Sequence, residues 1–189
     1  MTKAELRKIY RQKRKEISWK EKEQWTDLIL INFQKIELPF IDCVHTYLAM
    51  EAQNEISTDI FANYLKFLNP GLKRVVPKIN LDTAEMRHYI LNDDVEMIPN
   101  DFGIIEPLTG EKVTANDIDL VLTPLLAFDK MGYRVGYGKG FYDRFFGQCR
   151  EETIKVGLSF FEPVESIDNI DAFDIPLNYC VTPTSVYKF

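Results

Sequence analysis

The stretch that decides the fold is IDLVLTPLLAFDKMGYRVGYGKGFYD, residues 118–143. Its first part, residues 118–124, is almost continuously apolar, which is typical of a strand buried on both faces of a parallel sheet. Its last part contains alternating glycines and then aromatic residues, which predicts a helix that begins near Phe141 and runs towards Cys149. A buried strand, a glycine-rich loop and a helix in this order indicate an α/β protein.

Helix signals recur on the N-terminal side of this stretch. Thr2 and Ser18 are each followed three residues later by a glutamate, and this capping-box spacing predicts helices that begin near residues 3 and 19. The second of these helices is expected to end at residues 38–39, where a proline follows a leucine. A third helix is expected to begin at Ser57 or Thr58 and to end at the Asn-Pro-Gly sequence of residues 69–71.

Short β-prone runs alternate with these helices. Residues 93–117 are expected to be mostly loop, because prolines and glycines are frequent there. No internal repeat or linker is visible, so we expect a single domain over residues 1–189, with a mainly parallel sheet and helices on both faces. Besides residues 118–124, strands are predicted at residues 44–49, 74–77, 86–91, 154–158 and 179–182.

Composition is that of a folded protein of the cytoplasm. The 189 residues are 46% apolar and 28% charged, and no apolar run is long enough to cross a membrane. The charged N-terminus is not followed by an apolar segment, so no secretory signal is expected. Three scattered cysteines, Cys43, Cys149 and Cys180, indicate reduced thiols. Because the formal net charge is −6, nucleic acid is not an expected partner, and neither is a membrane.

Several enzyme classes lack their usual sequence signatures. The only histidines are His45 and His88, and no Cys/His group has the spacing of a zinc site. The G-x-S-x-G sequence of many serine hydrolases is absent. Neither a zinc site nor a serine hydrolase is therefore expected.

The loop after the predicted strand 118–124 has the composition of a phosphate site. Glycine lets backbone N–H groups approach a ligand closely, and successive N–H groups near the start of a helix bind anions. Arg134 and Lys139 add positive charge. The spacing fits neither the Walker A loop nor the dinucleotide-binding motif, and a mobile turn with incidental charges is the alternative interpretation. The alternating glycines of this loop are Gly136, Gly138 and Gly140.

Two further groups of charged residues have two interpretations each. Asp143, at the predicted helix start, complements the helix dipole or holds Mg²⁺ beside bound phosphates. Lys3 and Arg7 lie four residues apart in a strongly basic N-terminal segment and share one helix face. This face contacts phosphates, or it is a solvated surface that docks an acidic partner or RNA.

The central motif has the form F-D-x-x-G-x-R over residues 128–134 and R-x-G-x-G-x-G-[YF]-Y-D over residues 134–143. In this it resembles the 5-formyltetrahydrofolate cyclo-ligases, also called methenyltetrahydrofolate synthetases. The resemblance runs nearly from end to end. Weaker matches occur in the family's order at Lys3-x-x-Leu6-Arg7, residues 54–58, 76–78, 103–107 and 119–124, and Asp174 ahead of residues 180–182.

This resemblance implies a three-layer α/β/α sandwich, Rossmann-like, and a monomer that uses ATP and Mg²⁺. The implied substrate is the small molecule 5-formyltetrahydrofolate, which is cyclised to 5,10-methenyltetrahydrofolate with release of ADP and phosphate. In the family, the formyl oxygen is thought to attack the γ-phosphate, and N10 then closes the ring. The alternative from another class is a sugar-phosphate isomerase or a CoA-transferase-like enzyme of related fold, which would need no ATP.

The resemblance also implies a role for each matching residue. In catalysis it implies Arg134, Lys139 and Tyr142. For Mg²⁺ it implies Asp143 and Asp174. For the folate it implies Met50, Glu55, Tyr137, Gly138, Lys139, Gly140 and Phe141. For ATP it implies Lys3, Arg7, Arg134, Val135, Gly136, Tyr137, Gly138, Lys139, Gly140, Phe141 and Tyr142.

Some positions depart from the family pattern. Val135 replaces the usual leucine, Phe141 the first tyrosine of the motif, and Phe173 a histidine that often precedes the late acid. One or two additional residues near 51–53 leave two glutamates, Glu51 and Glu55, as alternatives for the contact with the pterin.

Overall fold

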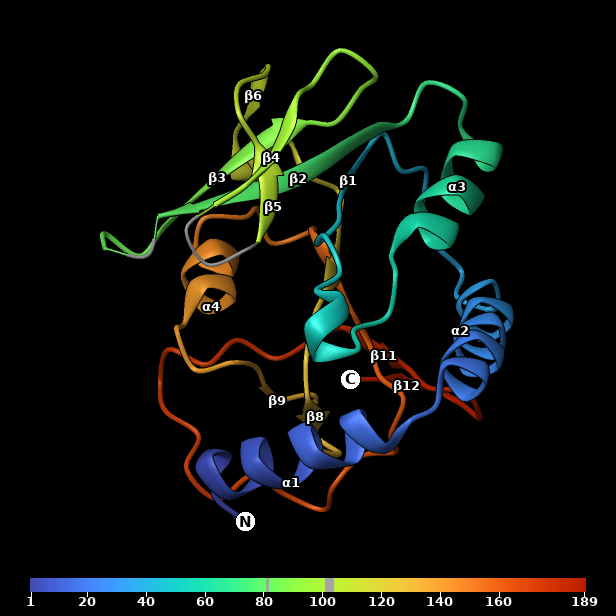
Figure 1. The fold of residues 1–189 in the computed structure, drawn as a ribbon, viewed down its shortest axis with the longest axis vertical. Helices are drawn as coiled ribbons and strands as arrows, with labels where there is room; N and C mark the ends of the chain where they lie inside the picture. The colour runs from blue at the N-terminus through green and yellow to red at the C-terminus, as the bar shows by residue number, and fades with distance from the viewer. Residues whose placement is uncertain (81, 101–103) are drawn as a thin grey trace.

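A computed structural model describes residues 1–80, 82–100 and 104–189, and a mixed β-sheet forms its centre (Figure 1). The strands of this sheet are β1 (Cys43–His45), β2 (Lys73–Asn80), β3 (Glu85–Ile90), β6 (Lys112–Val113), β7 (Leu120–Thr123), β10 (Ile154–Leu158), β11 (Tyr179–Val181) and β12 (Val186–Lys188). Their order is β12-β11-β10-β7-β1-β2-β3-β6. The neighbours from β11 to β2 pair in parallel, and β12, β3 and β6 are antiparallel. The predicted mainly parallel sheet is confirmed.

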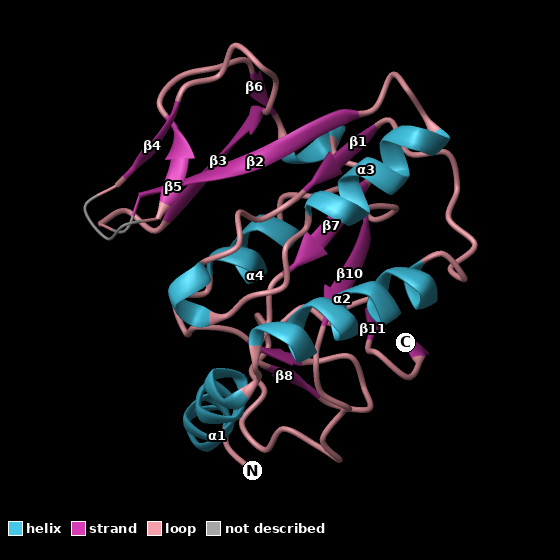
Figure 2. Cartoon of the chain, turned by 45° about the vertical axis from the view of Figure 1, so that its right-hand side comes forward, coloured by secondary structure: helices cyan, strands magenta, loops and turns pink. Residues whose placement is uncertain are grey.

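Helices lie on both sides of the sheet at the central strand β7, with α2 (Trp19–Phe33) and α3 (Asp59–Leu68) on one side and α4 (Phe141–Phe146) on the other (Figure 2). Leu120 and Leu122 pack in one apolar cluster with α2 and α3. Val121 packs in another with Phe145 of α4. Side chains alternate between the faces of a strand, so the fully buried run 120–123 serves both layers. The three-layer α/β/α arrangement is confirmed.

Helix α1 (Lys3–Glu16) belongs to neither layer. It packs at one end of the molecule on the hairpin of β8 (Ala127–Phe128) and β9 (Arg134–Val135), where Leu6 and Tyr10 join a third apolar cluster (Figure 1). Both capping boxes are present, at Thr2 and at Ser18, so the predicted starts of α1 and α2 are confirmed. The helix thereby closes the end of the molecule towards which the parallel strands run.

Several predicted boundaries are wrong. The strand predicted at 44–49 ends at His45, because the chain leaves the sheet there and reaches the short helix η1 (Glu51–Gln53). Helix α2 ends at Phe33 rather than at residues 38–39, and α4 ends at Phe146 rather than near Cys149. The region 93–117 also contains β4 (Met97–Pro99), β5 (Ile105–Pro107), β6 and η2 (Ala115–Asp117). These strands are too short to give a periodic signal.

Two other observations complete the comparison of the chain with its fold. Gly103, the first residue of the segment 103–107 that resembles the family, lies outside the described residues. None of the helices in the described ranges is long and apolar enough to cross a membrane.

Candidate active site

A cleft of about 1390 Å³ opens beyond the carboxyl ends of the adjacent parallel strands β1 and β7. The residues that follow these strands, Tyr47 and Pro124, lie in its wall. Ligands bind at this edge in open α/β sheets, because loops diverge there. The remaining wall is formed by one face of α1, the η1 turn, the hairpin of β2 and β3, the glycine loop between β9 and α4, and residues 169–175.

The glycine loop adopts a backbone that side chains disfavour. Gly138 has a φ of 95° and Gly140, which caps α4, has a φ of 69°. Arg7 of α1 fixes the loop: its Nε donates a hydrogen bond of 2.9 Å to the carbonyl of Gly136. A Cβ at Gly138 would lie 3.2 Å from Cζ of Arg7, so glycine lets the guanidinium lie directly against the backbone.

Basic residues at four-residue intervals along α1 line the same cleft. Lys3 and Arg7 were predicted from the sequence, and Arg11 and Lys15 continue the row. The i, i+4 spacing that joined the first pair could also have identified the second. Lys139, exposed on the glycine loop, also lines the cleft. This placement favours an anionic ligand in the cleft over a docking surface for RNA or an acidic partner.

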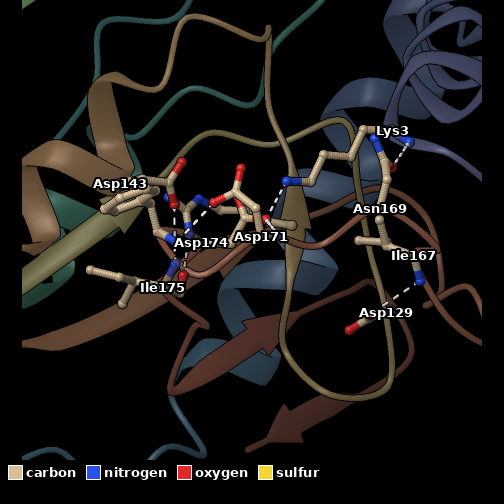
Figure 3. Close-up of polar contacts among 10 residues, drawn as sticks. Lys3, Asp129, Asp143, Ile167, Asn169, Asp171, Asp174 and Ile175 are labelled. Atoms are coloured by element: carbon tan, nitrogen blue, oxygen red, sulfur yellow. Dashed lines mark hydrogen bonds and ion pairs between the residues drawn. The ribbon is translucent and has the colours of Figure 1, made fainter.

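The two predicted metal-binding carboxylates each pair with a base (Figure 3). Oδ1 of Asp143 accepts a hydrogen bond of 2.7 Å from Nη2 of Arg134 and one of 3.3 Å from the backbone N–H of Ile175. Oδ2 of Asp174 forms an ion pair with Lys3 and accepts a hydrogen bond of 2.8 Å from the backbone N–H of Asp171. The second oxygen of each carboxylate accepts no hydrogen bond from the described residues.

This pair of carboxylates fits Mg²⁺ only in part. The described residues contain no group of three or more His, Cys, Asp or Glu side chains that could hold a metal ion. Mg²⁺ usually takes one or two carboxylates and completes its shell with water and substrate phosphates, so Asp143 and Asp174 suffice beside a nucleotide. The present partners, Arg134 and Lys3, would then need other anions.

Arg134 is buried more deeply than an arginine that is free to bind phosphate. It is buried, its guanidinium lies 4.6 Å above the ring of Phe146, and its Nη1 donates a hydrogen bond of 2.5 Å to the carbonyl of Ile175. Val135, also predicted to bind ATP, has its side chain buried in the third apolar cluster, with Leu6 and Tyr10 of α1. Val135 does not line the cleft, and its carbonyl already accepts a hydrogen bond of 2.8 Å from the N–H of Leu126, so the structure does not bring it to the other predicted ATP residues.

Asp129, the acid at the start of the signature motif, holds the backbone in place. Its Oδ1 accepts hydrogen bonds of 3.0 Å from the N–H groups of both Met131 and Tyr133, and its Oδ2 accepts one of 3.2 Å from Ile167 (Figure 3). The buried carboxylate therefore joins the β8–β9 turn to the segment that leads to Asp174.

Glu55 rather than Glu51 lies in the cleft. Its Oε2 accepts a hydrogen bond of 2.8 Å from the N–H of Met50, and its Oε1 accepts one of 2.5 Å from the hydroxyl of Tyr137. Burial raises the pKa of the Glu55 carboxyl. The Glu51 side chain is 84% exposed and pairs with Lys22 at 3.2 Å. The structure thus places Glu55, Met50 and Tyr137 together.

Tyr142 lines the cleft but carries a buried hydroxyl. Its ring lies 6.2 Å from that of His45 and 6.0 Å from that of Phe146, measured between centroids. No hydrogen-bond partner for the hydroxyl occurs among the described residues, and burial raises its pKa, so the phenol is neutral. Arg14, which the sequence indicated only as part of the basic segment, is buried beside Tyr137 and Glu55.

An α/β sheet, a basic cleft at its carboxyl edge and a glycine loop beside two carboxylates are typical of α/β enzymes that bind phosphates. Comparison with known sequences identifies which one. A family model described as the 5-formyltetrahydrofolate cyclo-ligase family matches residues 1–183. The 5-formyltetrahydrofolate cyclo-ligase of Mycoplasma pneumoniae is 31% identical over 162 residues, which are 85% of this chain and 86% of that protein.

Another cyclo-ligase and two solved structures of methenyltetrahydrofolate synthetases are also similar to this chain. The 5-formyltetrahydrofolate cyclo-ligase of Haemophilus influenzae is 37% identical over 100 residues, which span 48% of this chain and about half, 52%, of that protein. The NMR structure of 5,10-methenyltetrahydrofolate synthetase from Aquifex aeolicus superposes with a TM-score of 0.80 at 31% identity, covering 100% of this chain and 93% of the other. For the synthetase of M. pneumoniae the TM-score is 0.75 at 27% identity, with coverage of 97% and 99%.

This chain belongs to the 5-formyltetrahydrofolate cyclo-ligase family. The family match over nearly the whole chain excludes the alternative of a sugar-phosphate isomerase or CoA-transferase-like enzyme.

Proposed function

We propose that the cleft between α1 and the glycine loop catalyses the ATP-dependent cyclisation of 5-formyltetrahydrofolate to 5,10-methenyltetrahydrofolate, with release of ADP and phosphate. The chain is a C–N ligase with a small-molecule folate substrate. One observation carries the assignment to this cleft: the basic face of α1, the glycine loop, the two paired carboxylates and Glu55 all line it. We further propose that the enzyme acts as a monomer in the cytoplasm.

ATP binds with its phosphates between α1 and the glycine loop. Lys3 and Arg7 supply positive charge from α1 and Lys139 supplies it from the glycine loop, and residues 136–142 line the same cleft. Phosphate oxygens compete with Asp174 for Lys3 and with Asp143 for Arg134, because both are anions of similar hydrogen-bonding geometry. Arg134 therefore reaches the nucleotide when Asp143 gives it up.

Asp143 and Asp174, once released, are free to hold Mg²⁺. Held by these two carboxylates, Mg²⁺ would supply positive charge to offset the charge that develops on the transferred phosphoryl group. The two exchanges complement each other: two bases move from carboxylates to phosphates, and the two carboxylates gain a cation. No charge is left unpaired in a partly buried site, which would be costly.

The folate binds with its pterin at Glu55. Each oxygen of the Glu55 carboxylate already accepts one hydrogen bond and retains a lone pair for the N–H and NH₂ edge of the ring. Met50 packs on the ring, and Tyr137, Phe141 and the intervening loop residues border both ligands. Arg134, Lys139 and the neutral phenol of Tyr142 orient the reacting groups. Catalysis is then mostly positioning, with the formyl oxygen held near the γ-phosphate.

The test is a spectrophotometric assay of the purified chain with 5-formyltetrahydrofolate. Methenyl-folate absorbance is expected to rise only when ATP and Mg²⁺ are both present, and ADP and phosphate should form in equal amounts. Thermal stabilisation by ATP·Mg²⁺ and by the folate should accompany turnover. Stabilisation by sugar phosphates alone, without methenyl-folate formation, would contradict the proposal.

A further inference from the structure

Arg14 is a buried base beside the folate end of the cleft, and no step of the reaction described above uses it. Its side chain is 7% exposed. Its Nη1 donates a hydrogen bond of 3.0 Å to the hydroxyl of Tyr137 and lies 4.0 Å from Oε1 of Glu55. Its Nη2 donates to the carbonyl of Leu125 at the end of the central sheet. The guanidinium thus joins α1, the glycine loop and the sheet at one point.

We propose that Arg14 is a positioning residue that holds Glu55 and Tyr137 in the geometry that binds the pterin. Arg14 touches neither ATP nor the reacting atoms and acts through these two side chains. The inference rests on the proposed function in one respect, namely that Glu55 receives the pterin.

A second link joins the Glu55 turn to the same part of α1. Asn54 adopts a left-handed backbone with a φ of 49°, and its Nδ2 donates hydrogen bonds of 2.9 Å to the carbonyl of Arg14 and 3.0 Å to that of Ile17. The amide thereby supplies a donor to two carbonyls at the helix end, of which that of Arg14 also accepts the N–H of Ile17 at 3.3 Å. Residues 50–55 are consequently held on α1 from both sides, by Asn54 on the backbone and by the Arg14 guanidinium on the carboxylate.

The positive charge of Arg14 also affects the ionisation of Glu55. The Glu55 residue is 3% exposed, and a buried carboxylate loses hydration that favours its charged form. Arg14 is the one base within 4.0 Å of Glu55 among the described residues, since Lys22 pairs with Glu51. Lys22, which lies beyond 4.0 Å, also favours the charged form of Glu55, and the remaining ionisable groups that act on this carboxyl are neutral phenols: Tyr47, Tyr137 and Tyr142. Together with the hydrogen bonds from Met50 and Tyr137, Arg14 therefore favours the ionised form of Glu55 against the effect of burial, and the acceptor of two pterin hydrogen bonds must be ionised.

The test compares steady-state kinetics of Arg14→Met and Arg14→Lys with the wild type across pH. Arg14→Met should raise KM for 5-formyltetrahydrofolate about tenfold or more, because a charge-assisted contact is lost, and leave KM for ATP within about twofold. The acidic limb of kcat/KM should move to higher pH by about one unit. Arg14→Lys restores the charge but cannot reach Tyr137 and Leu125 together. The acidic limb of kcat/KM should therefore return to its wild-type pH, while KM for the folate should return only part of the way to the wild-type value.

Two controls separate this role from simple destabilisation. Lys8→Met removes a charge from an exposed position of the same helix and should leave all parameters unchanged. In a Glu55→Gln background, replacement of Arg14 should have little further effect on the folate KM, because the group through which it acts is already altered. If Arg14→Met fails to fold, Arg14→Lys alone decides: wild-type folate KM in that variant overturns the proposal.

The outcomes also distinguish the pterin contact of Glu55 from the positioning role of Arg14. A normal folate KM in Glu55→Gln would refute the pterin contact itself. A raised KM in Glu55→Gln, combined with wild-type values and an unmoved pH limb in both Arg14 variants, would refute only the role of Arg14.

Discussion

At the residue scale, Asp143 and Arg134 form a pair of opposite charges in which the base is almost fully enclosed. The side chain of Arg134 is 5% exposed and that of Asp143 is 27% exposed. The carboxylate therefore meets the cleft while the guanidinium supports it from behind. Lys3 and Asp174 form a second pair beside it. In the proposed reaction, this exposed carboxylate would hold Mg²⁺ together with that of Asp174.

Replacement of Asp143 by asparagine should abolish Mg²⁺-dependent turnover, with a loss of roughly 100-fold or more, because an amide is a poor ligand for Mg²⁺. The measurement is the rate of methenyl-folate formation during a Mg²⁺ titration, with circular dichroism to confirm the fold. Asp171→Asn is the matched control: among the described residues, its side chain accepts a hydrogen bond only from the N–H of Phe173, which an amide oxygen can also accept. Normal Mg²⁺-dependent turnover in Asp143→Asn would refute the metal assignment.

At the scale of elements, the phosphate site depends on the contact of α1 with the glycine loop. These elements are far apart in sequence, and Arg7 lies against Gly138 because that residue has no side chain. Gly136 differs from Gly138: a Cβ there would meet no described atom within 4 Å. The two glycines of one motif therefore carry different constraints.

Gly138→Ala should cost about 1–2 kcal/mol of folding free energy, because alanine is strained at a φ of 95°, and lower Tm by roughly 3–8 °C. It should also raise KM for ATP, since the added methyl displaces Arg7. Gly136→Ala should keep a melting temperature close to that of the wild type. Thermal unfolding of both variants, with ATP kinetics of the first, makes the comparison. Equal Tm values for the two variants would contradict the strain argument.

At the scale of the whole molecule, two buried histidines connect stability to pH. His45 of β1 and His88 of β3 lie edge to face with ring centroids 5.1 Å apart, and both pack on Phe145 of α4. Neither nitrogen of His45 has a hydrogen-bond partner among the described residues. Burial lowers the pKa of His45 well below its usual value and that of His88 to about 4. The folded protein therefore holds both rings neutral.

A lowered folded-state pKa means that the unfolded chain binds more protons as the pH falls below about 6.5, so stability should decrease from there towards pH 4. Each histidine contributes at most about 1.4 kcal/mol per pH unit. His88→Phe should reduce the loss of unfolding free energy per pH unit. The raised pKa of Glu55 opposes that loss, and it does so equally in the wild type and the variant. Urea unfolding at several pH values between 7.5 and 4.5 measures the difference. An identical dependence of unfolding free energy on pH in the wild type and the variant would show that His88 does not contribute to it.

Much of the architecture could be predicted because its signals are local. The apolar run of β7 requires burial on both faces, and the boxes at Thr2 and Ser18 satisfy N–H groups within one helical turn. The ends of β1 and α2 could not be predicted, since the point at which a chain leaves a sheet or a helix packs depends on distant segments.

The sequence by itself determined the α/β class, the glycine loop as the phosphate-binding segment we propose, and the family resemblance. Only the tertiary structure decided between Glu51 and Glu55, placed Arg14 behind Glu55, and paired Lys3 with Asp174. The physical reason is the range of the interactions. Caps and periodic burial act within a few residues, whereas these charges meet only after α1 and the segment 169–175 fold against the same edge of the sheet.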